Sequence, residues 1–399
     1  MKPSLRLSRR ARWAVPGGLV AVAAAVTAGS VITVAQAAPE LPARSPAQLL
    51  AAVAGHIGLP PAMTGTVVET ASLGIPDLPG SGNPTSITSL LSGSHTIKVW
   101  YASPTHIRLA VPVSLSETDV IRNGSTVWYW DSKSNTVTRM QLPAEPAKAP
   151  QATPTPAPTQ VPLTPQQAAQ QVLAAVGPTT TVSVDPAATV AGQAAYQLVL
   201  APKSSSSLIG RVTIALDGQH MDVPLRVQVF AKGATAPAFQ VGYTSIGFVQ
   251  PAAANFSFTP PPGAKVTTES PMKAAQNTAG QAKTAADTPQ VLGKDWLSVA
   301  VLPSSALSGI AGGSNAAGVA GQAAQSAAAG PGGGSGAGVA IGPVVAALLK
   351  SATPVHGAWG SGRLLHTGLV SVLILNGSGK VLVGSVTPAV LYSDAAQVK

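Results

Sequence analysis

The chain has no cysteine among its 399 residues. Disulfide bonds, thiolate zinc sites, iron–sulfur clusters and cysteine nucleophiles are therefore excluded. A lipid-modified cysteine after an export signal is excluded as well, so the mature protein is not itself a lipoprotein. A chain of this length can bury enough apolar surface to fold without covalent cross-links.

Charged and aromatic residues are also scarce, at 10% and 4% of the chain. The formal net charge is +10, but five of the basic residues lie in the first twelve positions: Lys2, Arg6, Arg9, Arg10 and Arg12. Without residues 1–37, 19 Lys+Arg stand against 14 Asp+Glu. No basic cluster with interleaved aromatic residues remains, so we expect no binding to nucleic acid.

Residues 1–37 have the order of a secretory signal. The basic start is followed by an apolar run from Trp13 to Val34 and by the small-residue site Ala35-Gln36-Ala37. This order predicts a signal peptide that is cut after Ala37. An uncleaved membrane anchor is the alternative, because about 20 apolar residues span a bilayer. In either case the chain is expected to be exported, to the extracytoplasmic cell envelope or the medium.

Motifs for phosphate, nucleotide or acyl-transfer chemistry are missing. The segment Gly377–Lys380 resembles the end of a phosphate-binding loop, but Val381 stands where a Ser or Thr should hold magnesium. The glycines at 336–342 lie in low-complexity sequence and lack the strand and the acidic residue of a dinucleotide site. No G-x-S-x-G nucleophile elbow is present.

Pairs of histidines and of carboxylates give little support for a metal site or for acid–base catalysis. His95 and His106 lie on neighbouring predicted strands and could approach each other, although rim positions are the simpler interpretation. Glu117 and Asp119 share one face of a predicted strand, and we expect them to be solvated beside the Asn123-Gly124 turn. The sequence therefore predicts no catalytic residue, no metal site and no cofactor, and a protein that is not an enzyme.

Most of the remaining pattern has the period of two that is typical of strands. Apolar or aromatic residues alternate with polar ones, between Gly, Pro, Asn and Asp, at 97–101, 107–111, 196–200, 211–216, 225–229, 239–248 and 256–258. Residues 120–142 add three short strands joined by a turn at Asn123-Gly124, for which we expect the type I′ form, and by a polar loop at 131–135. About ten antiparallel strands indicate one large curved sheet or a sandwich, mainly β and of α+β class.

Two short helices are predicted beside these strands. Ser45-Pro46 begins one that ends near Gly55, and Thr164-Pro165 begins another that ends at Gly177. Each has a hydroxyl N-cap and a proline at the first helical position. One apolar stripe on each helix predicts that both lie on a sheet or across its open side.

Three segments lack the composition of a folded core. Residues 143–163 are rich in Pro, Ala and Thr and predict an extended linker between two halves of the sheet. Residues 271–294 form a polar linker, and residues 304–342 form a Gly/Ala/Ser loop within a C-terminal β extension at 295–399. We expect Trp296–Leu302 and the hairpin of 363–375 and 380–386 to pack on the main sheet.

Two segments carry a resemblance to a known family. Val120–Leu142, with its Asn-Gly turn, Trp-Tyr-Trp-Asp strand and closing Val-Thr-Arg, resembles the meander of the LolA-type lipoprotein carriers. Asn255–Val266 is similar to the last core strand of that family and its proline-glycine exit. With the helix at 46–54, the resemblance covers residues 38–270, as an exported member whose Ala, Gly and Pro content fits a GC-rich actinobacterial genome.

The resemblance implies a strongly curved antiparallel sheet that forms an unclosed barrel, with helices across its open side. It implies an acyl lipid or a lipoprotein as partner, held by apolar residues that face the cavity: Ile97, Val99, Ile107, Leu109, Val111, Leu198, Leu200, Ile214, Leu216, Val227 and Val229. The RseB-type envelope regulators belong to the same superfamily, so binding of an anti-sigma factor or another membrane-bound protein partner is the alternative. From the pattern alone, these residues could equally fill a closed core.

Overall fold

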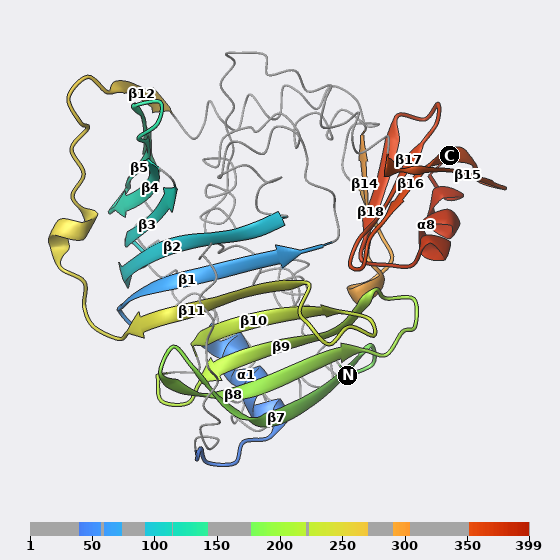
Figure 1. Ribbon diagram of the computed structural model, residues 1–399, viewed down its shortest axis with the longest axis horizontal. Coiled ribbons are helices and arrows are strands. Elements are labelled where there is room, and N and C mark those ends of the chain that lie inside the picture. Colours follow the sequence, from blue (N-terminus) through green and yellow to red (C-terminus); the bar gives the residue numbers. More distant parts are fainter. Residues whose placement is uncertain are drawn as a thin grey trace, which may run out of the picture.

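The computed structural model describes residues 40–56, 60–73, 92–113, 115–142, 177–220, 223–269, 290–303 and 351–398. Figure 1 shows two sheets with little helix. The first is a mixed sheet of twelve strands and the second is a separate antiparallel sheet of six. The mainly β fold class predicted from the sequence is confirmed.

The large sheet is open in its hydrogen-bonding order, with β12 at one edge and β7 at the other. Its strands, in that order, are β12 (Lys265–Glu269), β6 (Thr136–Gln141), β5 (Thr126–Asp131), β4 (Ser116–Asn123), β3 (His106–Val113), β2 (Ser92–Ser103), β1 (Met63–Ser72), β11 (Phe239–Gly247), β10 (Pro224–Ala231), β9 (Ile209–Asp217), β8 (Gln193–Pro202) and β7 (Thr180–Val190). The chain thus builds two halves, β1–β6 and β7–β11, which meet where β1 pairs with β11. The predicted linker at 143–163 and nearly all of the predicted helix at 164–177 lie outside the described residues.

One pairing corrects the expectation of a purely antiparallel sheet. β12 runs parallel to β6, from Lys265 opposite Thr136 to Glu269 opposite Met140. The chain leaves β11 near the centre of the sheet and reaches the far edge through the short helix η1 (Ala253–Phe256). A strand that arrives by such a crossover, instead of a tight turn, can run in either direction.

The predicted strand at 256–258 is wrong for a related reason. These residues cross over β3–β5, where Phe256 packs edge-on against His106 and the Phe258 ring centroid lies 5.5 Å from that of Trp128 and 6.0 Å from that of Trp130. Large aromatic side chains gave this segment the appearance of a strand. Here they cover one face of the sheet that other strands make.

The meander at 120–142 is confirmed as β4, β5 and β6, with its first turn shifted by one residue. Asn123 is still paired with Thr126, so the two-residue loop is Gly124-Ser125. Only Gly124 has a positive φ, of 60°. A type I′ turn requires positive φ at both central residues, so the predicted turn type is wrong.

The predicted helix at 46–54 is confirmed as α1 (Pro46–His56). The Gln48 backbone N–H donates to Ser45 Oγ at 3.3 Å, and the Ser45 N–H donates to Gln48 Oε1 at 2.8 Å. This reciprocal pair is a capping box, which satisfies two of the donors that a helix leaves open at its start.

The C-terminal strands form a sheet of their own with a separate core, and of the segments expected to pack on the main sheet only Trp296 contacts its core. The order of this second sheet is β13 (Gln290–Leu292), β14 (Val299–Pro303), β18 (Lys380–Gly384), β17 (Ser371–Leu375), β16 (Gly360–His366) and β15 (Thr353–Gly357). A turn at 367–370 divides the expected strand at 363–375 into β16 and β17. The helix α8 (Pro388–Ala395), which was not predicted, packs Leu391 and Ala395 into the core of this sheet. An apolar face with its own helix needs no cover from the large sheet.

The two sheets are joined by a short backbone ladder. Ser207, in the loop between β8 and β9, forms an isolated antiparallel bridge with Val386. The Leu208 N–H donates to Ser385 O at 2.9 Å, and the Thr387 N–H donates to Ser206 O at 2.8 Å. Trp296 strengthens the contact, because its Nε1 donates to Thr180 Oγ1 at 2.7 Å while its ring packs on the core of the large sheet.

Candidate ligand-binding site

The apolar side chains predicted to face a ligand gather on one face of the large sheet, which we call the inner face. One cluster contains nine of the eleven: Ile97, Val99, Leu109, Val111, Leu198, Leu200, Ile214, Leu216 and Val227. Ile107 lies in an adjoining cluster with Met63, Tyr101 and Val223, and both clusters include Tyr243. Val229 is half-buried and belongs to neither cluster.

Coverage of the inner face is uneven. On β8 and β9, Leu198 and Leu216 are fully buried, in the same cluster as Leu49 and Leu50 of α1. The helix itself lies against β7 and β8. On β3, by contrast, Ile107, Leu109 and Val111 are only half-buried. The β8–β9 part is therefore a closed core, and the β3 part retains accessible apolar surface.

Sequence reasoning missed the strand at the centre of this face. β1 points Val67, Glu69 and Ala71 inward, all of them buried, in register with the inward residues of β2. Gly65 takes another inward position, where a Cβ atom would lie 2.8 Å from the Tyr243 ring. A glycine and a glutamate at inward positions break the apolar alternation by which strands are recognised.

Glu69 is the most unusual residue of the inner face. It is 0% exposed, and neither carboxyl oxygen has a hydrogen-bond partner. Its cross-strand neighbours are His95 on β2 and Val241 on β11. Because burial penalises the charged form, the pKa of Glu69 is raised to about 8. At neutral pH the group is therefore mainly a neutral carboxylic acid, which can both donate and accept a hydrogen bond.

The opposite face, which we call the outer face, holds the carboxylates expected to be solvated. That expectation is wrong for Asp119, which is 1% exposed and accepts a hydrogen bond from Arg108 Nη2 at 2.7 Å. Glu117 lies 3.7 Å from the same nitrogen. Burial raises the pKa of Asp119 to about 6, although Arg108 opposes the shift. Asp119 lies in the middle of β4, four residues before Asn123, so β3 and β5 flank it on both sides and keep it out of solvent.

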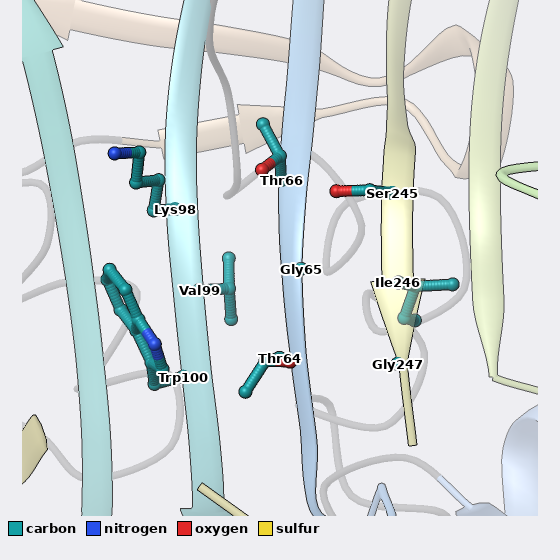
Figure 2. A pocket seen from close by; sticks show the side chains of 9 residues that line it. All are labelled: Thr64, Gly65, Thr66, Lys98, Val99, Trp100, Ser245, Ile246 and Gly247. Atoms are coloured by element: carbon teal, nitrogen blue, oxygen red, sulfur yellow. The ribbon is translucent and has the colours of Figure 1, made fainter. Parts of the chain in front are cut away.

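A groove of about 410 Å³ also opens over β2, β1 and β11. Figure 2 shows Lys98 and Trp100 along β2, Thr64 and Thr66 on β1, and Ser245 on β11. The Arg108 guanidinium lies 5.2 Å from the Trp100 ring centroid and extends this polar and aromatic surface toward β3. Its lining thus combines hydroxyl groups, one ammonium group and an indole ring.

The described residues contain no group of three or more His, Asp or Glu side chains that could hold a metal ion. His95 and His106 do not approach each other, because His106 pairs with Ser103 and His95 lies eight residues further along β2. Over the same described residues, no helix is both long enough and apolar enough to cross a bilayer.

Neither a family model nor a curated protein matches this chain. Among solved structures, the MucA/MucB complex of Pseudomonas aeruginosa is similar at 13% identity, with 88% of this chain and 96% of that chain covered and a TM-score of 0.40. The LolA superfamily protein NE2245 of Nitrosomonas europaea matches at 11% identity, with 54% and 99% covered and a TM-score of 0.21. An uncharacterised conserved protein of Thermus thermophilus matches at 11% identity, with 56% and 98% covered and a TM-score of 0.31.

The matched structures thus include MucB and a LolA-superfamily protein. With identities of 13% or less and TM-scores of 0.40 or less, they assign neither a family nor an activity to this chain.

Proposed function

We propose that this chain is a non-catalytic, exported binding protein of the cell envelope that holds acyl chains against the inner face. The observation that carries the proposal is the half-buried apolar strand β3, which continues the buried cluster of β8 and β9 without being sealed by it. Acyl chains would complete this core, since each buried CH₂ group contributes roughly 0.8 kcal/mol.

The proposal includes an inner face that is concave, as in an unclosed barrel. Three strands lie between β7 and β11, so in a flat sheet the two would be about 19 Å apart. Cα atoms of β7 and β11 nevertheless approach within 8 Å of each other. This approach supports a sheet that bends over its apolar face at the β7 edge.

Between a carrier and a regulator, the second sheet favours an RseB-like regulator that binds an anti-sigma factor or another membrane-bound protein. A carrier needs only the large sheet as its container. The second sheet has its own buried core and is attached to the first through Ser207 and Val386. Its edge strand β15 is largely exposed, and an exposed edge can pair with a strand of a partner.

Acyl binding is tested by native mass spectrometry of the full chain purified without detergent, followed by lipid extraction. We expect co-purifying acyl lipid, and its loss in Leu109→Arg, which puts a charge on the accessible part of the inner face. Thr244→Arg adds the same charge at an exposed position of β11 and should keep the lipid. A lipid-free wild-type protein would contradict acyl binding.

The regulatory role is tested in the native host. Loss of a regulator changes the expression of envelope-stress genes and leaves acylated proteins in place, whereas loss of a carrier displaces them. A photo-cross-linking residue at His356 on β15 should capture a membrane protein in living cells, and one at Lys133, exposed on the large sheet, should not. Displaced lipoproteins with unchanged gene expression would favour the carrier.

A further inference from the structure

The groove over β2, β1 and β11 lies on the outer face, opposite the apolar cluster of the inner face. On β1, Thr64 and Thr66 alternate with the inward residues, and the register places them beside Trp100 and Lys98 of β2. On the other side, Ser245 of β11 lies opposite Thr66. These five side chains line the groove together (Figure 2), so it is separate from the surface proposed to hold acyl chains.

The fold leaves room for a side chain at Gly247, which the chain does not use. Gly247 lines the groove opposite Thr64, and its φ is not positive. A Cβ atom there would lie 3.7 Å from Thr64 Oγ1 and 3.9 Å from Val249 Cγ2, which are ordinary contact distances. Neither the backbone conformation nor the packing therefore requires glycine. A glycine in a strand often marks a place where a ligand comes close, and here it keeps the groove open.

The polar side chains of the groove are available to a ligand. The hydroxyl groups of Thr64, Thr66 and Ser245 form no hydrogen bond with a described residue, and neither does the ammonium group of Lys98. β1, β2 and β11 are internal strands, so a peptide cannot add to them as a further strand. A ligand is held by side chains instead. Hydroxyl groups both donate and accept, which suits a ligand that carries hydroxyl groups itself.

The groove attracts an anion. Lys98 is the one charged residue among the described residues that line it. On the neighbouring strands, the carboxylates of Glu117 and Asp119 lie 3.7 and 2.7 Å from Arg108 Nη2 and are engaged there. Arg226 of β10 is on the same face and forms no ion pair with a described residue. An anionic group of a ligand therefore meets Lys98 without competition from a carboxylate in the lining.

Trp100 adds an apolar surface to this polar groove. Its ring is half-buried, with the Arg108 guanidinium on the β3 side at 5.2 Å from the ring centroid. Figure 2 shows the indole beside β2, with Lys98 further along the same strand. The face of an aromatic ring is negative and attracts positively polarised C–H groups. A sugar ring presents C–H groups on its face and hydroxyl groups at its rim, so it matches the indole and the three hydroxyl groups together.

We propose that this groove binds an acidic sugar residue of a glycan. The sugar ring packs on Trp100, and its anionic group pairs with Lys98. Its hydroxyl groups form hydrogen bonds with Thr64, Thr66 and Ser245. The proposal goes beyond acyl binding and does not depend on it, because it concerns the opposite face of the sheet.

The test measures the binding of three probes to the full chain by isothermal titration calorimetry at low ionic strength. Tetragalacturonate is the acidic sugar, galactotetraose is a neutral sugar of the same length, and blocked tetraglutamate carries the same number of carboxylates without a sugar. We expect tetragalacturonate to bind roughly fivefold more tightly than galactotetraose, the effect of one exposed ion pair. A similar margin is expected over tetraglutamate, which cannot stack on the indole or pair with the hydroxyl groups.

Substitutions at two positions locate the site. Lys98→Gln should lower the affinity for tetragalacturonate to that for galactotetraose, whereas Lys133→Gln, on the exposed loop between β5 and β6, is the matched control and should change nothing. Gly247→Leu should fill the groove and weaken binding roughly tenfold, the loss of the stacked ring. Gly247→Ala adds only the Cβ atom and should weaken it less. Thermal unfolding checks that both glycine variants fold, as the contact distances at the Cβ position predict.

Each result bears on one part of the proposal. Equal affinity for galactotetraose overturns the acidic class, and equal affinity for tetraglutamate identifies an acidic peptide in place of a sugar. Unchanged binding in Gly247→Leu, or a wild type that does not bind tetragalacturonate, overturns the site. Acyl lipid should be retained in Lys98→Gln and Gly247→Leu, so a failure here leaves the proposed acyl binding standing, and a lipid-free wild type leaves the groove standing.

Discussion

Two parts of one sheet face treat the same kind of residue differently. Leu216 on β9 is fully buried in the cluster that includes Leu49 and Leu50 of α1, whereas Leu109 on β3 is half-buried. Both are inward-facing leucines on antiparallel strands of one sheet. Strand alternation therefore identifies the face, and only the covering element decides whether a residue on it fills a core or offers a surface.

The comparison also divides the residues predicted to bind a ligand. Those on β8 and β9 hold the protein together, so substituting them changes stability before it changes binding. Those on β3 can be substituted with less risk to the fold. Experiments on ligand binding should therefore start on β3, and the substitutions below test whether the division is correct.

The largest effect is expected for Leu216→Ala. Removing a fully buried leucine side chain leaves a cavity, and we expect the free energy of unfolding to fall by about 3 kcal/mol. Urea denaturation followed by circular dichroism measures this change. A loss of less than about 1 kcal/mol would mean that the β8–β9 part is not a closed core.

The next effect concerns Glu69 and pH. Its pKa is higher in the folded chain than the ordinary value of 4.5, so the folded state binds more protons than the unfolded state between pH 4.5 and 8. Stability from this group is therefore complete below pH 4.5 and lost as the pH rises through 8. Relative to Glu69→Gln, the wild type should lose about 2 kcal/mol between pH 6 and pH 8, measured by urea denaturation at each pH. Parallel curves for the two proteins would show that Glu69 is not held neutral.

Asp119→Asn tests whether the ion pair with Arg108, on the outer face, stabilises the β3 part of the large sheet. The substitution removes the charge that Arg108 contacts at 2.7 Å and leaves the guanidinium with the more distant Glu117. Hydrogen bonds between charged groups contribute about 2 kcal/mol, and we expect a loss of that order. Lys133→Gln, on the exposed loop between β5 and β6, is the control and should change little. A neutral Asp119→Asn would mean that the cost of burying the Asp119 charge offsets the gain from the ion pair.

Thr387→Pro tests how the second sheet is attached to the large sheet, at the loop between β8 and β9. Thr387 has a φ of −61°, which proline adopts without strain, and its side chain makes no capping hydrogen bond. The substitution therefore removes little besides the N–H that donates to Ser206 O. We expect a loss of about 1 kcal/mol and earlier cleavage between the sheets in limited proteolysis. An unchanged cleavage rate would show that the Leu208–Ser385 hydrogen bond and the Trp296 contacts hold the sheets together without it.

The smallest effect is expected for Leu109→Ala, at about 1 kcal/mol or less in the ligand-free protein. The same substitution should weaken acyl binding, so that the difference in stability between wild type and variant grows when ligand is added. A loss as large as that of Leu216→Ala would place Leu109 in the core and remove the distinction between the two parts.

Much of the fold could be predicted from the sequence because local signals were strong. Ser45-Pro46 predicted α1, and the alternation around Val99, Leu198 and Ile214 predicted strands whose apolar residues gather on one face. The polar residues at the two turns of the meander predicted β4, β5 and β6. Each of these signals acts within a few residues along the chain.

The errors came from contacts between distant segments. β1 was missed because its inward positions include Glu69 and Gly65, and the Gly65 position has no room for a side chain beside the Tyr243 ring. The parallel pairing of β12, the second sheet and the burial of Asp119 depend in the same way on partners far away in sequence. No local pattern reports on such partners.

The pairing of β1 with β11 has a consequence for how the chain folds during synthesis. Thr64 pairs with Gly247, so one side of β1 stays without its partner strand until nearly all of the large sheet has been synthesised. Pairings this distant in sequence form slowly, and an unpaired strand edge invites association with other chains. If the chain is threaded through a membrane from its N-terminus, β1 is the first strand to emerge and waits longest for its second partner. Folding on the far side is then the stage at which this protein depends most on chaperones.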